Sequence, residues 1–258
     1  HTGDTMKDFE NYVVLVTGGG SGIGQKTTEL FVNEGAEVII ADLNREAIDD
    51  TIKSIGKKVS GKVCDVTNSK DIIELKNFVQ EKYGKIDVLV NNAGKVLHGT
   101  LEELKEEEWD STMNVLLKGP FLVTKHLLPL LKKSDHPSIV NVSSVTSIVN
   151  WPRNMVYGSS KAGLNKLGEQ ITRDFPWLRC NTIQPGIIDT PIYGFYASEQ
   201  EKKERFEKYT GLIPAGYIGK TEDVGHCILF LSSKKASYIH GAEIIIDGGF
   251  SKNWLPDL

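Results

Sequence analysis

Short apolar runs alternate with longer segments of helical periodicity along almost the whole chain of 258 residues. Strands that strictly alternate with helices pair in parallel through right-handed crossovers, because each helix returns the chain to the same end of the sheet. Runs such as YVVLV at 12–16 and KIDVLV at 85–90 are apolar on both faces, as a sheet covered on both sides requires. The pattern therefore predicts an α/β fold with a doubly wound parallel sheet, a three-layer αβα sandwich in a single domain.

The expected elements follow from this alternation. Strands are predicted at 12–16, 37–41, 58–64, 86–90, 138–143, 178–183 and 243–246, and helices at 22–34, 44–54, 68–82, 100–131 with a break, 155–174 and 221–231. Residues 187–217 interrupt the rhythm with a charged helical piece between Pro, Gly and Tyr residues. They predict a mobile lid over a binding cleft, with a solvated surface excursion as the alternative. Residues 6–258 form the predicted domain, and residues 1–5 are interpreted as an expression remnant.

Composition excludes several classes of function. With 40% hydrophobic and 25% charged residues and a net charge of −4, the chain lacks the basic face that nucleic acids or anionic membranes need. Its longest apolar window, 115–131, is interrupted by Lys and Pro, so no membrane span is expected. Three widely spaced cysteines predict a reducing, cytoplasmic setting, and six histidines without paired spacing predict no metal site.

A glycine-rich stretch, TGGGSGIG at 17–24, lies between the first apolar run and the first helical segment. A strand, glycines and a helix start present bare backbone N–H groups and a helix dipole to a phosphate. Gly18 would allow the tight turn, Gly22 a close approach of the backbone, and Gly24 close packing of helix on strand. The spacing G-x-x-x-G-x-G differs from the G-x-G-x-x-G fingerprint, which leaves a structural turn as the alternative. The favoured interpretation is a Rossmann-type dinucleotide site.

Asp42 ends the second apolar run, 18 residues after Gly24. This is close to the spacing of about 20 residues at which a carboxylate accepts the hydroxyls of an adenosine ribose. A carboxylate there would repel a 2′-phosphate, and Ser21 in the loop offers no cation to hold one. Arg45 is the nearby cation that would compete with Asp42 by holding a 2′-phosphate, but it lies where a helix is expected to begin. The cofactor is therefore predicted to be NAD rather than NADP, with helix capping by Asp42 as the alternative.

Tyr157 and Lys161 lie four residues apart on a predicted helix, so their side chains share one face. Ser144 follows the run at 138–143 and brings a hydroxyl to the same sheet edge. Oxidation of an alcohol releases a proton from oxygen, and a phenol with a pKa of about 10 is a poor base at neutral pH. An ammonium about 4 Å away would lower that pKa by about three units at an effective dielectric of about 20. We therefore expect Tyr157 to be the general acid/base, Lys161 to lower its pKa and Ser144 to hold the substrate oxygen.

These residues resemble the short-chain dehydrogenase/reductase family in its single-domain branch. The segments TGGGSGIG, NNAG, NVLLKGPF, VNVSS, YGSSK and QPGIIDTP occur in that family's order and spacing, and the resemblance runs from about Phe9 to Phe250. It implies that Asn114 is a fourth catalytic residue, which helps to hold a water that relays protons through Lys161. It also implies a homo-oligomer, either a tetramer or a dimer.

The strand ends and the resemblance together define the expected cofactor contacts. Asp65 could accept the adenine amino group, and the small residues Ala93 and Gly94 would leave room for the dinucleotide. The resemblance places the backbone of Ile188 at the carboxamide, and Thr190 at the carboxamide or the pyrophosphate. The full expected set is Gly18, Ser21, Gly22, Ile23, Gly24, Asp42, Leu43, Asp65, Val66, Asn92, Ala93, Gly94, Tyr157, Lys161, Pro185, Gly186, Ile188 and Thr190.

The leading hypothesis is an NAD-dependent oxidoreductase that interconverts a small-molecule secondary alcohol and a ketone. A 3-oxoacyl-[acyl-carrier-protein] reductase is the second, and Asp42 counts against its usual NADPH. A non-catalytic NAD-sensing protein is the third, although Tyr157 and Lys161 are both present. Trp151 lies between Ser144 and Tyr157, where substrate is expected to pass. An aromatic residue there favours an apolar or ring-bearing substrate, with a packed core tryptophan as the alternative.

Overall fold

A single parallel sheet of seven strands forms the centre of the molecule, with the order β3-β2-β1-β4-β5-β6-β7. The computed structural model describes residues 7–193 and 198–253, so the expected remnant at 1–5 and part of the expected lid lie outside the described residues. The strands are β1 (Val13–Thr17), β2 (Glu37–Asp42), β3 (Val59–Val63), β4 (Val88–Asn91), β5 (Ser138–Val142), β6 (Arg179–Pro185) and β7 (Glu243–Ile246). The principal helices are α1 (Gly22–Asn33), α2 (Arg45–Ile55), α3 (Ser69–Lys82), α4 (Glu106–Met113), α5 (Gly119–Leu131), α6 (Met155–Asp174), α7 (Glu199–Thr210) and α8 (Thr221–Ser232).

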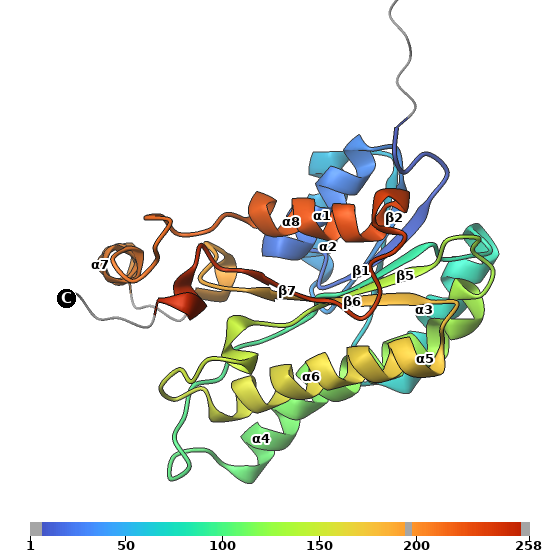
Figure 1. Ribbon diagram of the computed structural model, residues 1–258. Helices are drawn as coiled ribbons and strands as arrows, with labels where there is room; N and C mark the ends of the chain where they lie inside the picture. The colour runs from blue at the N-terminus through green and yellow to red at the C-terminus, as the bar shows by residue number, and fades with distance from the viewer. Residues whose placement is uncertain (1–6, 194–197, 254–258) are drawn as a thin grey trace, which may run out of the picture.

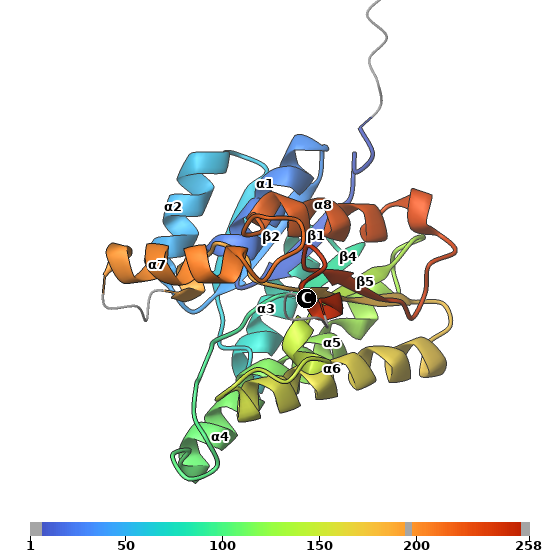
Figure 2. The same ribbon diagram turned by 60° about the vertical axis from the view of Figure 1, so that its left-hand side comes forward.

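Helices cover both faces of the sheet, and the alternation of side chains along each strand divides the interior into two cores. In β1, Val14 and Val16 pack toward α1, α2 and α8, whereas Leu15 packs toward α3, α5 and α6. Figure 1 shows the two helical layers above and below the sheet. In Figure 2, α7 stands apart from both layers. The predicted doubly wound three-layer sandwich is confirmed.

Each predicted strand and helix is present, with one substantial error. The helix expected at 100–131 begins only at Glu106, because residues 100–105 form turns before the first helical residue. The expected break lies at a π-helical turn, Asn114–Lys118, which joins α4 to α5. Pro120 lies in the first turn of α5, directly after this π-helical turn. Among the described residues, no helix has the length and hydropathy needed to cross a membrane.

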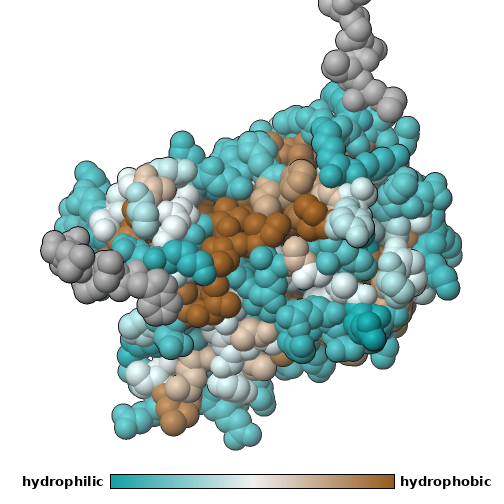
Figure 3. Space-filling view, viewed as in Figure 1, coloured by the Kyte–Doolittle hydropathy of each residue, from teal (hydrophilic) through white to brown (hydrophobic). Residues whose placement is uncertain are grey.

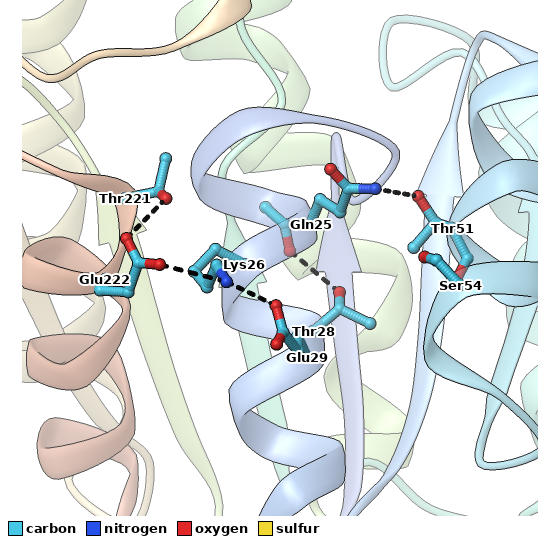
Figure 4. A network of polar contacts seen from close by, with 9 residues as sticks. Gln25, Lys26, Thr28, Glu29, Thr51, Ser54, Thr221 and Glu222 are labelled. Atoms are coloured by element: carbon cyan, nitrogen blue, oxygen red, sulfur yellow. Dashed lines mark hydrogen bonds and ion pairs between the residues drawn. The ribbon is translucent and has the colours of Figure 1, made fainter.

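Polar contacts on the outer face tie α1 to its two neighbours (Figure 4). Gln25 Nε2 donates to Thr51 Oγ1 of α2 at 3.2 Å, and Lys26 Nζ lies 3.2 Å from a carboxylate oxygen of Glu222 in α8. Both charged side chains are partly exposed, so the ion pair contributes little free energy of folding. Their position holds the start of α1, which follows the glycine loop.

Arg179 at the start of β6 holds the end of α8. Its guanidinium donates to the backbone oxygens of Leu231 (2.7 Å), Ala236 (3.1 Å), Ser232 and Ser233 (both 3.3 Å), and Ile239 (3.4 Å). The last carbonyl groups of a helix have no N–H partner within the helix. The Arg179 guanidinium supplies hydrogen-bond donors to these carbonyls.

Replacing this guanidinium should destabilise the protein. Arg179→Met keeps much of the side-chain length but leaves several carbonyls without a donor, and we expect the free energy of unfolding to fall by about 2 kcal/mol. Urea unfolding followed by circular dichroism measures the change. Arg173→Met, which removes an exposed guanidinium from α6, is the matched control and should be nearly neutral. Equal stability of the two variants would contradict the assigned role.

Candidate active site

Two adjoining cavities lie along the carboxyl ends of the strands. The smaller, about 360 Å³, lies against the ends of β1, β2 and β3, and the larger, about 670 Å³, lies against β5, β6, α6 and α7. Ile23, Asn92, Gly94, Thr190 and Ile192 line both cavities, so the two form one continuous trough. Ligands of open parallel sheets bind at this edge.

The trough brings together most of the predicted site residues. The smaller cavity is lined by Gly18, Ser21, Gly22, Asp42, Leu43, Asp65, Val66 and Ala93, and the larger by Ser144, Tyr157, Lys161, Pro185, Gly186 and Ile188, in addition to the shared residues. Gly24 and Asn114 line neither. Gly24 lies behind the loop, where the predicted close packing is found.

The glycine loop is packed too tightly to accept side chains. Gly18 has a φ of +63°, and a Cβ there would lie 2.8 Å from the Cα of Ala93. A Cβ on Gly24 would lie 2.1 Å from the carbonyl oxygen of Gly18. Asn92 closes the arrangement, because its Nδ2 donates to the backbone oxygens of Thr17 (3.1 Å) and Gly18 (3.0 Å). This leaves bare backbone beside the smaller cavity, which fits a pyrophosphate at the start of α1.

Asp42 lines the smaller cavity, whereas the catalytic candidates Ser144, Tyr157 and Lys161 line the larger one. One carboxylate oxygen accepts from the backbone N–H of Gly20 and the other from that of Asn44, both at 3.0 Å. Asn44, not Asp42, caps α2, since its side chain accepts from the N–H of Ala47. Arg45 pairs with Asp49 at 3.0 Å along α2 and leaves the Asp42 charge without a cation. These contacts fit an adenosine ribose better than a 2′-phosphate.

Asp65 carries contacts that give it a structural role as well. Its Oδ1 accepts from the backbone N–H (2.8 Å) and the hydroxyl (2.7 Å) of Thr67, so the carboxylate holds the turn after β3. It still lines the smaller cavity beside Val66.

Three polar groups converge on the wall of the larger cavity. Ser144 follows β5 and lies close enough to the phenol of Tyr157 to lower its pKa, and it accepts from the Thr146 hydroxyl at 3.0 Å. Lys161 lies one helical turn after Tyr157, is only 4% exposed and donates from Nζ to the carbonyl of Val142 at 2.8 Å. Its Nζ lies 5.7 Å from the centre of the Tyr157 ring. The arrangement can hold a substrate oxygen between a hydroxyl and a phenol.

Among the protein's own groups, burial outweighs any lowering of the Tyr157 pKa by Lys161, and the lowering expected together with a positively charged nicotinamide stays a prediction. Burial raises the pKa of the phenol to about 12, although the hydrogen bond to Ser144 opposes the shift. Burial also lowers the pKa of Lys161 to about 8. Both shifts have the same cause, since a buried site disfavours the charged form of either group. The phenol is therefore protonated at neutral pH.

Asn114 opens the π-helical turn between α4 and α5, and its carbonyl accepts from the N–H of Gly119. This turn packs closely on α6, where a Cβ on Gly163 would lie 2.8 Å from Leu117. Val115 and Leu116 of the same turn line the trough, whereas Asn114 itself is half-buried beside it. Sequence reasoning missed both apolar residues, because nothing in the pattern indicates which side chains a π turn exposes.

The far wall of the larger cavity is aromatic. The Trp151 ring packs against Tyr209 of α7 and Phe250 of the C-terminal segment, with ring centres 5.5 Å apart in both pairs. Trp151 is therefore both a packed residue and a lining residue of the cavity, so the two interpretations of it do not exclude each other. The helix predicted within the lid is present as α7, and its Tyr209 closes this wall.

Comparisons with known proteins match most of the chain. A family model described as enoyl-(acyl carrier protein) reductase matches residues 18–251. The 3-oxoacyl-[acyl-carrier-protein] reductase FabG of Thermotoga maritima is 42% identical over 93% of this chain and 98% of its own. The chain belongs to the short-chain dehydrogenase/reductase family. It is thus an oxidoreductase of a family that uses NAD(P).

Other members of the family show how widely the substrates of related chains differ. The 7alpha-hydroxysteroid dehydrogenase of Bacteroides fragilis is 33% identical over 95% of this chain and 96% of its own. The ligand-free structure of the aldohexose dehydrogenase of Thermoplasma acidophilum superposes with a TM-score of 0.90 at 32% identity, covering 98% of this chain and 99% of that one. The fold is therefore shared by members named for an acyl thioester, a steroid and a sugar.

Proposed function

We propose that this protein is an NAD-dependent oxidoreductase that interconverts a secondary alcohol and a ketone, with Tyr157 as the general acid/base. The observation that carries the proposal is the continuous trough, which has the Asp42 carboxylate in its smaller part and the hydroxyls of Ser144 and Tyr157 in its larger part. A dinucleotide extended along it would have its ribose at the carboxylate and its reactive ring at the phenol.

Each catalytic candidate has a distinct task in this proposal. When bound, NAD supplies the acceptor for the two electrons and the hydrogen that leave the alcohol carbon. Ser144 holds the substrate oxygen, and Tyr157 takes the proton from that oxygen in oxidation or donates one in reduction. Lys161 binds ribose hydroxyls from its buried position. Asn114, at the π turn packed on α6, supports a water that returns the proton to solvent. Gly22, Ile188 and Thr190 contact the cofactor between the two ends.

The proposal is tested with a panel of secondary alcohols, sugars and hydroxysteroids, offered with NAD and then with NADP. Absorbance of the reduced nicotinamide reports turnover, and we expect kcat/KM to favour NAD. Asp42→Ser removes the charge that repels a 2′-phosphate, so the preference for NAD should fall about 10- to 100-fold. Asp50→Ser removes another exposed carboxylate of α2, outside both cavity linings, and is the control that should leave the preference unchanged. A wild-type enzyme that prefers NADP would refute the role of Asp42.

A 3-oxoacyl-[acyl-carrier-protein] reductase is the second candidate, favoured by the 42% identity to FabG of Thermotoga maritima. The protonated state of Tyr157 suits a reductase, because a neutral phenol donates the proton that a ketone requires. Reduction of acetoacetyl-coenzyme A with NADPH, faster than any alcohol oxidation with NAD, would favour this candidate over the first. A non-catalytic NAD-binding role is less well supported, since Ser144, Tyr157 and Lys161 are all in place.

We also predict a homo-oligomer, a tetramer or a dimer, in the cytoplasm. Support comes from β7, an edge strand with an open side, beside which apolar residues gather between β7 and α8 (Figure 3). An exposed apolar edge of this kind is commonly covered by another chain. No metal is proposed, in keeping with the described residues, which hold no metal-binding cluster of His, Cys, Asp and Glu.

A further inference from the structure

The larger cavity is lined by basic side chains that the proposed redox chemistry does not use. Lys95, His98, Arg153 and Arg205 are among its lining residues, and no aspartate or glutamate is among those that the structure describes. The chain as a whole has 34 acidic residues and 30 lysines and arginines, so composition predicts no such excess. The excess of basic over acidic side chains is therefore specific to the lining of this cavity.

Two of these side chains have no carboxylate partner. Arg153 is paired with Glu103 at 2.8 Å, and the His98 ring shares a hydrogen bond with Asn154 at 2.8 Å. Lys95 Nζ instead donates to the neutral hydroxyl of Ser111 at 2.6 Å. Arg205 of α7 forms no ion pair with any residue that the structure describes. Two positive charges, on Lys95 and Arg205, thus remain uncompensated at the cavity.

The same cavity offers an apolar wall next to these charges. Trp151, Tyr209 and Phe250 form it, and Leu212 adds to it. An uncharged substrate would use the apolar wall but leave both cations without a partner. A substrate with one anionic group and a short chain or ring would match both features, because a guanidinium binds carboxylates and phosphates through two parallel hydrogen bonds.

We infer that the substrate is an anionic secondary alcohol or ketone, with a carboxylate bound by Arg205 and Lys95 and its carbon skeleton packed on Trp151. This inference rests on the proposed oxidoreductase function and narrows its substrate class to hydroxy acids and oxo acids. In this inference the two cations determine which molecule binds, and the phenol and hydroxyl carry out the proton transfer.

The test compares each acid with its neutral ester. 3-Hydroxybutyrate, 4-hydroxypentanoate and mandelate are offered with NAD beside their methyl esters, and glycerol 3-phosphate beside glycerol, which asks whether phosphate serves as well as carboxylate. We expect kcat/KM to be at least tenfold higher for the acids. Arg205→Gln should abolish most of that preference through a KM raised about tenfold, with kcat and the esters little changed, and Lys95→Gln should act in the same direction.

The controls separate this inference from a general effect on α7. Lys203→Gln removes an exposed positive charge from the same helix outside the cavity lining and should leave the acid preference intact, and Arg205→Lys should restore part of it. Equal use of acids and esters by the wild type, or an unchanged preference in Arg205→Gln, would overturn the inference.

Failure of the inference and failure of the proposed function give different results. Turnover of the neutral compounds alone overturns the anionic substrate and leaves the oxidoreductase proposal standing. No turnover in either series with either cofactor counts against the proposed function. In that case isothermal titration calorimetry decides the inference, which is supported if the wild type binds the acids but not the esters and Arg205→Gln loses that binding, and overturned otherwise.

Discussion

Tyr157→Phe should lower the turnover of any accepted secondary alcohol by about 10²- to 10⁴-fold, the usual contribution of a general acid/base. The substitution keeps the ring that lies beside Lys161 and removes only the phenol hydroxyl. Binding of NAD, measured by fluorescence titration, should therefore change little. Steady-state rates in both directions measure the effect, and Tyr217→Phe, which alters an exposed tyrosine outside both cavities, is the matched control. Turnover of Tyr157→Phe within about tenfold of the wild-type rate would refute the proton-transfer role.

The direction of the pH dependence follows from the same residue. Burial raises the pKa of Tyr157 to about 12, so the phenol holds its proton through the neutral range. The protonated form donates to a ketone and the ionised form accepts from an alcohol. We therefore expect the wild-type rate of alcohol oxidation to rise with pH, and this dependence to disappear from the residual activity of Tyr157→Phe.

Gly24→Ala should disable the glycine loop. The new Cβ would lie 2.1 Å from the Gly18 carbonyl oxygen and 2.6 Å from Asn92 Nδ2, and neither the backbone atom nor the hydrogen-bonded amide can move without displacing the loop. Overpacking on this scale costs about 3 kcal/mol. Displacement of the loop by about 1 Å is expected to weaken NAD binding or turnover on the order of 100-fold.

The control for this substitution is another glycine with ordinary backbone geometry. Gly211, at the end of α7, has a φ of −64°, and a Cβ there would lie 3.5 Å from its nearest neighbour. Thermal unfolding and NAD titration of Gly211→Ala should match the wild type within about 0.5 kcal/mol. If Gly24→Ala bound NAD as tightly as Gly211→Ala, the close packing of α1 on the loop would not matter for the site.

Periodicity predicted the sheet well, because buried parallel strands are apolar on both faces and their helices are long enough to recognise. It also placed Asp42 and Ser144 at the carboxyl edge, because each stands at the end of a strand in a parallel sheet. The turns before α4 escaped prediction, because LEELKEEEWD has the composition of a helix from its first residue. The π turn at Asn114–Lys118 has no periodic signal of its own.

The charges around the larger cavity could not be predicted for a different reason. Lys95 and Arg205 are 110 residues apart in the chain, and neither lies in a recognisable motif. That both line one cavity depends on where α7 packs, which no local pattern specifies. The pKa of Tyr157 is a similar case, because the helical spacing to Lys161 is visible in the sequence and the depth of burial is not.

The wall built by Trp151, Tyr209 and Phe250 has a consequence for how proteins of this kind diversify. Its three rings come from separate connecting segments outside the sheet, whereas the residues proposed for proton transfer lie on α6 and directly after β5. Substitutions in those connections can therefore reshape the entrance without disturbing the reacting groups. A few substitutions in this aromatic wall can therefore change substrate specificity while the residues proposed for proton transfer stay the same.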